Sequence, residues 1–229
     1  MKAMILAAGV GSRLRPLTDE TPKALIEVEG VPMLERVARR LIAAGVDALI
    51  VNAHHFADRV EAFLAAKKGF GARFEVSREE TLLDTGGGLK KAAWFFDDGT
   101  PFFVHNVDVW SELDLAEMYR RHRAEPALAT LAVRARPTGR PLHFDPSGRL
   151  TPRAEAGAPL AFDGVHVISP ELFPKVTETG VFSITAVYRR LAAAGETIRA
   201  FRADAYEWHD IGSAARLDAA RRRAKEAKP

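Results

Sequence analysis

The amino-acid sequence predicts an α/β fold with a mixed, mostly parallel sheet and helices on both of its faces. Over the first half of the chain, short apolar runs alternate with segments whose apolar residues recur at helical spacing. The 229 residues are enough for one α/β domain with a substantial core. Hydrophobic residues make up 47% and charged residues 28%, which is the balance of an ordinary globular protein.

The first half contains four predicted strands separated by helices. The strands are expected at residues 2–8, 47–52, 73–77 and 101–106. A helix is expected at 33–44, because its apolar residues recur every three or four positions and Gly45 ends the pattern. A second helix follows the strand at 47–52, and a third is expected at 88–96, after three successive glycines.

The second half is less regular. Strands are expected at 128–134, 160–168 and 197–201, with a hairpin turn at Asp145-Pro146-Ser147-Gly148. Helices are expected at 183–194 and after Ser213. No linker or repeat interrupts the chain, so residues 1–229 are expected to form one domain. Within it, 1–134 would form the first part of the core, about 135–180 a lobe over the carboxyl edge of the sheet, and 181–229 the completion of the core.

Composition excludes several classes of protein. The absence of cysteine excludes disulfides and thiolate metal sites. A net charge of +3 is too small for a nucleic-acid footprint. No run approaches the roughly 20 apolar residues that cross a bilayer, and Arg13 and Arg15 interrupt the N-terminal apolar run before any signal-peptide cleavage segment. We expect a cytoplasmic monomer or homodimer that binds neither membrane nor nucleic acid.

A glycine-rich loop, Gly9-Val10-Gly11-Ser12, follows the first predicted strand. Glycine lets backbone amides approach a phosphate, and Arg13, Arg15 and Lys23 could neutralise phosphate oxygens. The loop lacks the Gly-Lys-Ser/Thr ending of a P-loop, and Leu14 stands where a dinucleotide fingerprint needs a third glycine. By itself, this pattern is also compatible with a plain tight turn.

The longer string, Gly11-Ser12-Arg13-Leu14-Arg15-Pro16 followed by Thr21-Pro22-Lys23, resembles the signature of sugar-1-phosphate nucleotidyltransferases. The resemblance extends over about residues 1–225 and implies a Rossmann-like, GT-A-like fold. It also implies that the loop holds a nucleoside triphosphate, with Arg13 on the β- and γ-phosphates and Lys23 at the reacting phosphate. The loop residues concerned are Ala7, Ala8, Gly9, Gly11 and Ser12.

Two aspartates follow predicted strands. An acid at the carboxyl end of a parallel strand faces the crevice where α/β proteins bind ligands, and Asp108 has this position. The resemblance implies that Asp108 and Asp210 bind Mg²⁺, and that Asn106 contacts the nucleotide sugar. Two carboxylates suit Mg²⁺, which takes few protein oxygens besides phosphates and waters. Asp210 could instead cap the last helix, whereas Asp114 is the better cap near Asp108.

The remaining site residues are implied by the resemblance alone. Gly86 and Gly87 are expected to contact the base through a flat main chain, although three successive glycines could also form a flexible turn. Gly139, Glu155 and Gly164 are expected to contact the acceptor sugar. The chain departs from the family pattern at two positions. Val107 stands where glycine is more frequent, and Asp163 where asparagine or serine is.

The short bacterial subgroup of the family is the nearest in length, and it uses UTP with N-acetylmuramate 1-phosphate or GTP with mannose 1-phosphate. The expected product is therefore an NDP-sugar with pyrophosphate, in cell-wall or other NDP-sugar biosynthesis, with UTP ahead of GTP. Two alternatives remain open. One is a cytidylyltransferase that acts on an amino-alcohol phosphate such as phosphocholine, with Trp110 and Trp208 around the cation. The other is a non-catalytic nucleotide-sensing module.

Overall fold

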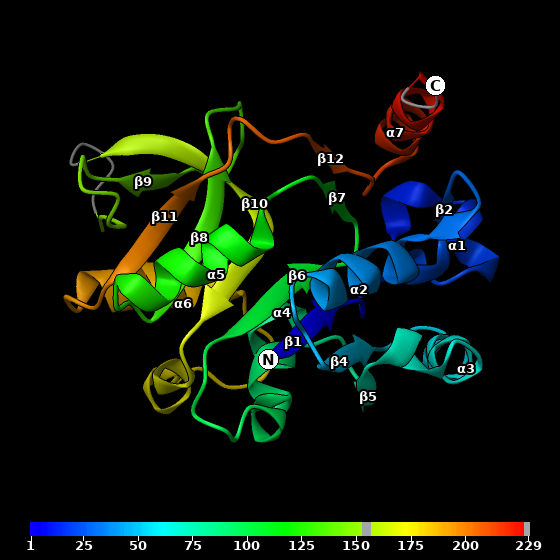
Figure 1. The fold of residues 1–229 in the computed structure, drawn as a ribbon, viewed down its shortest axis with the longest axis horizontal. Helices are drawn as coiled ribbons and strands as arrows, with labels where there is room; N and C mark the ends of the chain where they lie inside the picture. Colours follow the sequence, from blue (N-terminus) through cyan, green and yellow to red (C-terminus); the bar gives the residue numbers. More distant parts are fainter. Residues whose placement is uncertain (153–156, 227–229) are drawn as a thin grey trace.

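The computed structural model describes residues 1–152 and 157–226 and is built around one eight-stranded sheet (Figure 1). Seven strands follow the order β11-β8-β10-β6-β1-β4-β5, and β9 pairs with β10. Their bounds are β1 Lys2–Leu6, β4 Ala48–Ala53, β5 Arg73–Arg78, β6 Phe102–Asn106, β8 Ala129–Arg134, β9 Leu142–Phe144, β10 Ala158–Ile168 and β11 Ile198–Arg202.

The sheet is mixed and mostly parallel, as predicted. Strands β6, β1, β4 and β5 run parallel to one another, and so do β11 and β8. Strand β10 is antiparallel to both of its neighbours, β6 and β8, and to β9. The range that we assigned to a lobe therefore contributes β10 to the middle of the main sheet, and the lobe itself stays a prediction.

Helices cover both faces of the sheet. They are α1 Leu17–Glu20, α2 Met33–Ala43, α3 Ala57–Ala66, α4 Asp84–Lys91, α5 Leu115–Ala124, α6 Ile184–Ala193 and α7 Ala214–Glu226. Short 3₁₀ segments lie at η1 Ser12–Leu14, η2 Lys23–Leu25, η3 Lys68–Gly71, η4 Ala93–Phe95 and η6 Pro170–Lys175. In the described part of the chain, no helix is both long and apolar enough to cross a bilayer.

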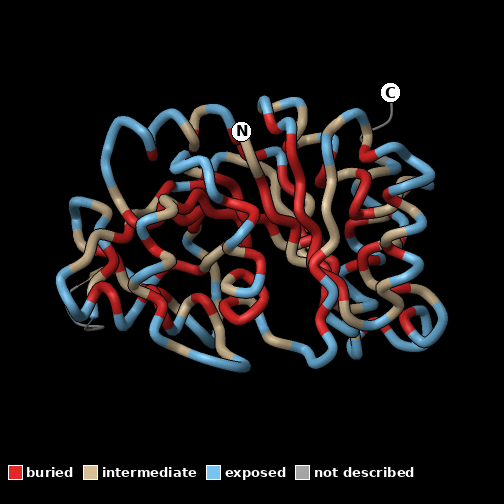
Figure 2. The backbone as a smooth tube through the Cα atoms, turned by 90° about the horizontal axis from the view of Figure 1, so that it is seen from below, coloured by how far each residue is buried: buried red, intermediate tan, exposed pale blue. Residues whose placement is uncertain are grey.

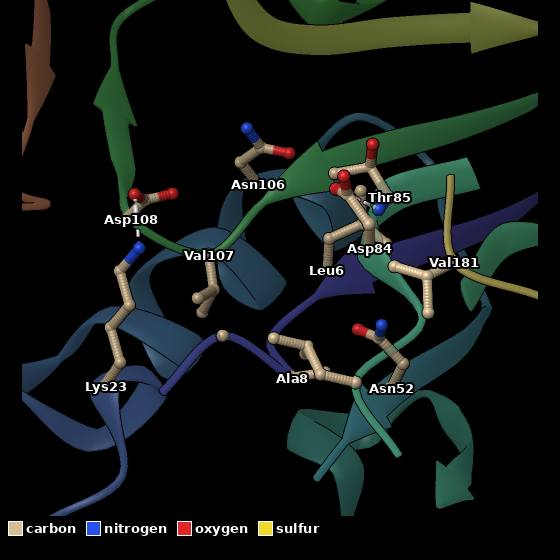
Figure 3. Close-up of a pocket in the computed structure, with 12 residues that line it drawn as sticks. Leu6, Ala8, Lys23, Asn52, Asp84, Thr85, Asn106, Val107, Asp108 and Val181 are labelled. Carbon is tan, nitrogen blue, oxygen red and sulfur yellow. Dashed lines mark hydrogen bonds and ion pairs between the residues drawn. The ribbon is translucent and has the colours of Figure 1, made fainter. Parts of the chain in front are cut away.

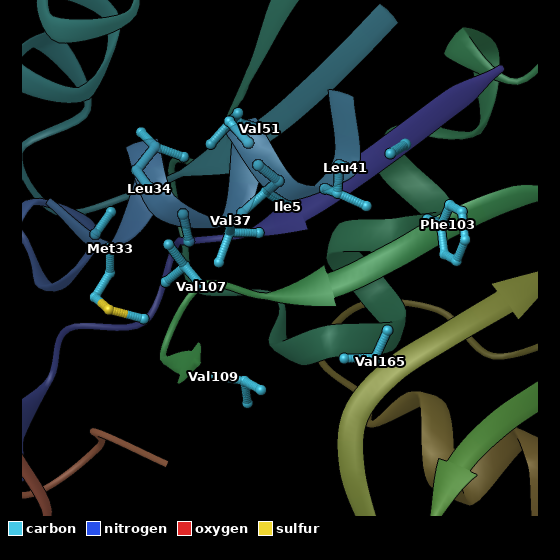
Figure 4. Packing of buried hydrophobic residues seen from close by; sticks show 14 of the residues in the cluster. Ile5, Met33, Leu34, Val37, Leu41, Val51, Phe103, Val107, Val109 and Val165 are labelled. Atoms are coloured by element: carbon cyan, nitrogen blue, oxygen red, sulfur yellow. The ribbon is translucent and has the colours of Figure 1, made fainter. Parts of the chain in front are cut away.

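Successive side chains of β1 point to opposite faces of the sheet, and each face has its own hydrophobic core. Ala3 and Ile5 pack with residues of α2, α3, α5 and α7, whereas Met4 packs with residues of α4 and α6 on the other face. Figure 4 shows part of the first core, with Ile5 and Val107 near the residues of α2. Figure 2 shows that buried backbone runs through the centre, while exposed backbone forms the periphery. Burial on both faces explains why these strands read as continuous apolar runs.

The prediction of a helix at 88–96 was wrong at both ends. Helix α4 begins at Asp84, and residues 93–95 form η4 instead of a continuation of it. All three glycines lie inside α4, although glycine is a poor helix former. Close packing explains their presence: an added Cβ would lie 2.4 Å from the Phe182 ring at Gly86 and 2.5 Å from the Gly180 carbonyl oxygen at Gly87.

Two small antiparallel ribbons complete the fold. Strand β2 (Glu27–Val28) pairs with β3 (Val31–Pro32), and β7 (Val109–Ser111) pairs with β12 (Trp208–Asp210). Strands β7 and β12 are too short to show a period in the sequence; we expected a strand just before Asp210 without giving its bounds, and β7 was not predicted. The β7–β12 ribbon matters for function, because it lies directly after Asp108 and ends at Asp210.

Candidate active site

A cavity of about 380 Å³ lies at the carboxyl ends of the central strands. Leu6 ends β1, Asn52 lies near the end of β4, and Asn106 ends β6. Because these strands are parallel and adjacent, their ends meet at one edge of the sheet. The lining residues are Leu6, Ala8, Gly9, Lys23, Asn52, Leu82, Asp84, Thr85, Asn106, Val107, Asp108 and Val181 (Figure 3).

The glycine loop forms one wall of this cavity. Strand β1 ends at Leu6, two residues earlier than predicted, and the amide of Ala7 donates to Asn52 Oδ1 at 2.7 Å. Ala8 and Gly9 then line the cavity. Gly11 has φ of +67°, and an added Cβ there would lie 2.8 Å from Thr18 Cγ2. Both the conformation and the contact require glycine at this turn.

Lys23 and Asp108 meet at one end of the cavity. Lys23 lies in η2, Asp108 lies in the turn between β6 and β7, and Lys23 Nζ is 2.5 Å from Asp108 Oδ2 (Figure 3). Both side chains are more than four-fifths buried, so solvent screens the pair less than it would screen a surface pair. The sequence predicted that these two residues share a site, and the structure brings them into contact.

The β7–β12 ribbon brings Asp210 to the same place. Asp210 pairs with Val109 in the ribbon, and the amide of Ile211 donates to the Asp108 carbonyl at 2.9 Å. A Cβ added at Gly212 would lie 2.7 Å from Asp210 Oδ1 and 3.1 Å from Asp108 Oδ2. The same point is 3.1 Å from Arg13 Nη2. Two acids and one arginine from three distant segments therefore surround one position.

Asp210 also makes local contacts at the start of the last helix. Its Oδ1 accepts from the amide of Gly212 at 2.7 Å, and its Oδ2 is paired with Arg216 of α7. The amide of Gly212 lies before α7, which begins at Ala214, so this bond caps no amide of the helix itself, and the capping role of Asp210 stays a prediction. Asp114 acts as the predicted cap of α5 and accepts from the amide of Glu117 at 2.9 Å.

Val107 departs from the family pattern without an unusual backbone angle. It does not have positive φ, it is 1% exposed, and its amide donates to the Leu6 carbonyl at 3.1 Å. The side chain packs in the core beneath the cavity (Figure 4). The Val107 side chain therefore contributes to the hydrophobic core.

Sequence reasoning missed a buried polar pair behind the cavity. Asn52 Nδ2 donates to Glu79 Oε1 at 2.7 Å, and the amide of Leu83 donates to Glu79 Oε2 at 2.9 Å. Glu79 is 4% exposed and follows the end of β5. An added Cβ at Gly88 would lie 2.6 Å from Glu79 Oε1, so this glycine makes room for the carboxylate. Together with the bond to Ala7, the pair ties the glycine loop to the start of α4.

We expect Glu79→Leu to lower the free energy of unfolding by about 2 to 3 kcal/mol, because the buried donors of Asn52 and Leu83 would lose their acceptor. Urea denaturation measures this change. The exposed neighbour, changed in Glu80→Leu, is the control and should stay within about 0.5 kcal/mol of the parent. Equal stability of the two variants would contradict a structural role for the pair.

The start of α4 closes the far end of the cavity. Asp84, Thr85 and Val181 line it (Figure 3), and so does Leu82; Leu82 and Val181 are exposed apolar side chains. Gly86 and Gly87, which we expected to contact the base, do not line the cavity, and the amides of both donate to the Phe182 carbonyl. The flat main chain that we expected here is helical, and the neighbouring Asp84 and Thr85 were missed.

A second cavity, of about 280 Å³, adjoins the first and shares Asp84, Thr85 and Asn106 with it. The rest of its lining is Thr138, Arg140, Leu142, Phe162, His166, Ser183, Ile184 and Thr185. Hydroxyls and one guanidinium therefore surround a partly apolar space, a composition typical of pockets for small polar ligands.

The three predicted sugar contacts lie differently from one another. Gly139 lines a neighbouring hollow rather than this cavity, although it precedes Arg140. Gly164 has φ of +82°, and an added Cβ would lie 2.8 Å from Asn106 Nδ2, so Gly164 packs beneath the Asn106 side chain. Glu155 lies outside the described residues.

Asp163 faces away from both cavities. Its Oδ2 is 2.6 Å from Arg134 Nε, and its Oδ1 is 3.7 Å from Arg136 Nε. The Trp208 indole donates to the Asp163 carbonyl at 3.0 Å. Burial raises the pKa of Asp163, although the two arginines oppose this shift. Asp163, which stands where the family more often has asparagine or serine, therefore forms a buried ion pair with Arg134.

Comparison with known proteins identifies the family. The sequence model described as nucleotidyl transferase matches residues 2–144 of the chain. The chain belongs to this family. Since the match covers more than half of the chain and includes the glycine loop, Lys23 and Asp108, the resemblance seen in the sequence is confirmed.

Two curated relatives of this nucleotidyltransferase are N-acetylmuramate α-1-phosphate uridylyltransferases. The protein from Caulobacter vibrioides is 39% identical over 207 residues, covering 84% of this chain and 85% of that one. The protein from Neisseria meningitidis is 32% identical over 227 residues and covers 95% of both chains. The nucleotidyltransferase is thus a sugar-phosphate-type enzyme of the 2.7.7 class, as predicted.

Solved structures support the fold. A UDP-glucose pyrophosphorylase complexed with UDP-glucose matches the nucleotidyltransferase with a TM-score of 0.82 at 18% identity, covering 99% of each chain. A putative glucose-1-phosphate thymidylyltransferase from Bacillus anthracis gives 0.85 at 18% identity, with 100% of this chain and 97% of that one. The predicted α/β class with a mostly parallel sheet is therefore confirmed.

Proposed function

We propose that this enzyme transfers a uridylyl or guanylyl group from the nucleoside triphosphate to a sugar 1-phosphate, with UTP and N-acetylmuramate 1-phosphate as its first pair. The observation that carries the proposal is the convergence of Lys23, Asp108, Asp210 and Arg13 beside the glycine loop. Two cations and two acids at the carboxyl edge of a parallel sheet suit a polyphosphate bound with a metal ion.

The first cavity would hold the nucleotide. Ala8 and Gly9 offer main chain to the phosphates, and Arg13 and Lys23 would neutralise their oxygens. Leu82 and Val181 form an apolar rim that suits the flat face of a base. Asn106 lies between this cavity and the second one, within reach of the nucleotide sugar.

The acids fit a hard divalent cation. Asp108 and Asp210 face one point, and each is paired with a cationic side chain, Lys23 and Arg216 respectively. Among the described residues, no group of three or more histidine, cysteine, aspartate and glutamate side chains surrounds a metal position. This set suits Mg²⁺, which takes its other ligands from phosphates and water. When bound, Mg²⁺ would supply charge neutralisation at the phosphates.

The reaction needs positioning more than proton transfer. An anionic oxygen of the acceptor phosphate attacks the α-phosphorus, the bond from that phosphorus to the bridging oxygen breaks, and pyrophosphate leaves. No general base is needed, since the attacking oxygen already carries charge. Lys23 and Arg13 stabilise the charge that develops on the reacting and leaving phosphates, and the second cavity orients the acceptor in line.

The alternatives are not favoured. The two tryptophans of a phosphocholine site do not line either cavity, and guanidinium groups already face both rings: Arg36 lies 4.9 Å from Trp110, and Arg136 lies 4.4 Å from Trp208. A non-catalytic module would lack the lysine or an acid, whereas Lys23, Asp108 and Asp210 are present and lie close together. Cytoplasmic location and a monomeric or dimeric state stay predictions.

Pyrophosphate release tests the proposal. The enzyme is mixed with Mg²⁺ and each nucleoside triphosphate, paired in turn with N-acetylmuramate 1-phosphate, mannose 1-phosphate, glucose 1-phosphate and phosphocholine. We expect release with UTP or GTP and a sugar 1-phosphate. Release only with CTP and phosphocholine would favour the alternative transferase, and no release from any pair would favour the nucleotide-sensing module.

We expect Gly212→Ala to raise the Mg²⁺ concentration for half-maximal activity about tenfold, while the melting temperature changes little. The new Cβ would lie 2.7 Å from Asp210 Oδ1, which is too close, so the carboxylate must move away from Asp108. Ser213→Ala adds no atom at the next residue and is the control. Unchanged Mg²⁺ dependence in Gly212→Ala would contradict joint metal binding by the two acids.

A further inference from the structure

The second cavity has a single cationic side chain in its lining, Arg140. Among the described residues, its guanidinium has no ion pair, whereas the nearby Arg134 and Arg136 are committed to Asp163. Arg189 of α6 donates to the Pro141 carbonyl at 2.8 Å. Within the described ranges, Arg140 is therefore the guanidinium that both lines the second cavity and has no carboxylate partner.

Arg140 lies at the end of the acceptor site that is farther from the reacting phosphate. Of these two cavities, Lys23 and Asp108 line only the first and Arg140 lines only the second; Arg140 also lines the neighbouring hollow that holds Gly139. The acceptor phosphate must lie near Lys23, because that is where it attacks the triphosphate. The sugar then extends past Asp84, Thr85 and the amide of Asn106, which line both cavities, toward Arg140. Its far end meets a guanidinium, a group that binds carboxylates through two parallel hydrogen bonds.

The other polar groups of the second cavity cannot replace this interaction. Thr85 Oγ1 accepts from the Ile184 amide at 3.0 Å, and the hydroxyls of Ser183 and Thr185 lie 3.0 Å apart. The Asp84 carboxylate is turned to the Thr85 amide at 2.6 Å. These neutral or acidic groups suit sugar hydroxyls and an amide, but they do not attract a negative charge.

We propose that Arg140 selects an acceptor whose sugar carries a carboxylate in addition to its 1-phosphate. This inference rests on the proposed function and narrows its acceptor to an acidic sugar phosphate. A neutral hexose 1-phosphate would leave the guanidinium without an anionic partner. N-acetylmuramate 1-phosphate and N-acetylglucosamine 1-phosphate differ by one lactyl ether, which bears the carboxylate, so they form a matched pair of ligands.

The test measures kcat and KM for both sugar phosphates with UTP and Mg²⁺ in the parent enzyme, Arg140→Ala and Arg140→Lys. In the parent, we expect kcat/KM to favour N-acetylmuramate 1-phosphate by about 10- to 100-fold, the value of one charge-assisted interaction. Arg140→Ala should remove this preference through a higher KM for the acidic sugar and leave the neutral sugar within about twofold. Arg140→Lys should retain part of the preference, because lysine keeps the charge but not the planar fork.

Arg189→Ala is the matched control, since it removes a neighbouring guanidinium that lies outside the second cavity. It should keep the preference for the acidic sugar. Equal losses of kcat/KM for both sugars in Arg140→Ala, or a parent enzyme without the preference, would overturn the assignment of Arg140 while the transferase activity stands. If no turnover is seen, calorimetric titration of both sugar phosphates into the nucleotide-bound enzyme compares their affinities instead. Tighter binding of the acidic sugar phosphate without release of pyrophosphate would support the role of Arg140 and contradict the proposed function alone.

Discussion

Replacing Asp108 by asparagine should lower turnover about 10³-fold, equivalent to about 4 kcal/mol of transition-state stabilisation. The substitution keeps the size of the side chain but removes the charge that faces Asp210 and Lys23. An amide oxygen binds Mg²⁺ more weakly than a carboxylate, so the metal concentration for half-maximal activity should also rise. Steady-state pyrophosphate release at several Mg²⁺ concentrations measures both effects.

Measuring turnover at several Mg²⁺ concentrations distinguishes the loss of a metal ligand from the loss of the ion pair that holds Lys23 in place. Loss of the ion pair alone would lower kcat without changing the dependence on Mg²⁺, whereas loss of a metal ligand changes both. The control is Glu112→Gln, which removes a carboxylate four residues away that pairs with Arg40 at 2.6 Å, outside both cavities. Near-normal turnover in Asp108→Asn would refute the assignment of this residue as a metal ligand.

Mild acid should destabilise the fold by about 6 kcal/mol between pH 7 and pH 5, because three histidines are buried in the neutral form. Burial lowers the pKa of His105 and His122 to about 4 and that of His166 to about 3. Each lies near a neutral partner: the Asn106 carbonyl, the Thr130 and Ser169 hydroxyls, and the Tyr188 hydroxyl respectively. The Asn106 carbonyl raises the pKa of His105 but does not outweigh burial, and the hydroxyl partners of the other two histidines carry no negative charge.

Stability falls as the pH falls because the unfolded chain binds more protons than the folded one. An unfolded histidine has a pKa near 6.5, so below that pH the unfolded chain binds protons that the folded chain does not. Each histidine therefore loses about 2 kcal/mol of stabilisation by pH 5. Urea denaturation at pH 7, 6 and 5 measures the slope. His122→Gln, which retains a hydrogen-bonding side chain, should reduce the slope by about one third, and an unchanged slope would contradict this origin.

The sequence predicted the central strands because their apolar runs are long and their environment is uniform. Strands β1, β4 and β6 are buried on both faces, so apart from Lys2 at the start of β1 and His105 in β6 their residues are apolar or small until the ligand edge is reached. Asp108 could be assigned for the same reason, since a charged residue directly after such a run must lie at the edge. Lys23 was found through the resemblance of Pro22-Lys23, together with the glycine loop before it, to the family signature.

The features that the sequence did not predict depend on contacts between segments that are distant in the chain. The glycines of α4 look like a turn because glycine disfavours helices, but Phe182 and Gly180 approach so closely that no larger residue fits. The Asn52–Glu79 pair joins two strand ends, and no spacing in the chain marks it. Asp84 has φ of +59°, a conformation that a sequence pattern does not reveal, and it places this residue at the boundary of the two cavities.

The pairing of β7 with β12 also fixes when the proposed site comes into existence during synthesis. Ribosomes make a chain from its N-terminus, and domains generally fold as units. The glycine loop, Lys23 and Asp108 are made first, but the second acid arrives only with Asp210, about one hundred residues later. A nascent or prematurely terminated chain would carry the phosphate loop without a complete metal site. Fragments that end before Asp210 should therefore be unable to consume nucleotide, and activity would begin only after Asp210 has been made and β12 has paired with β7.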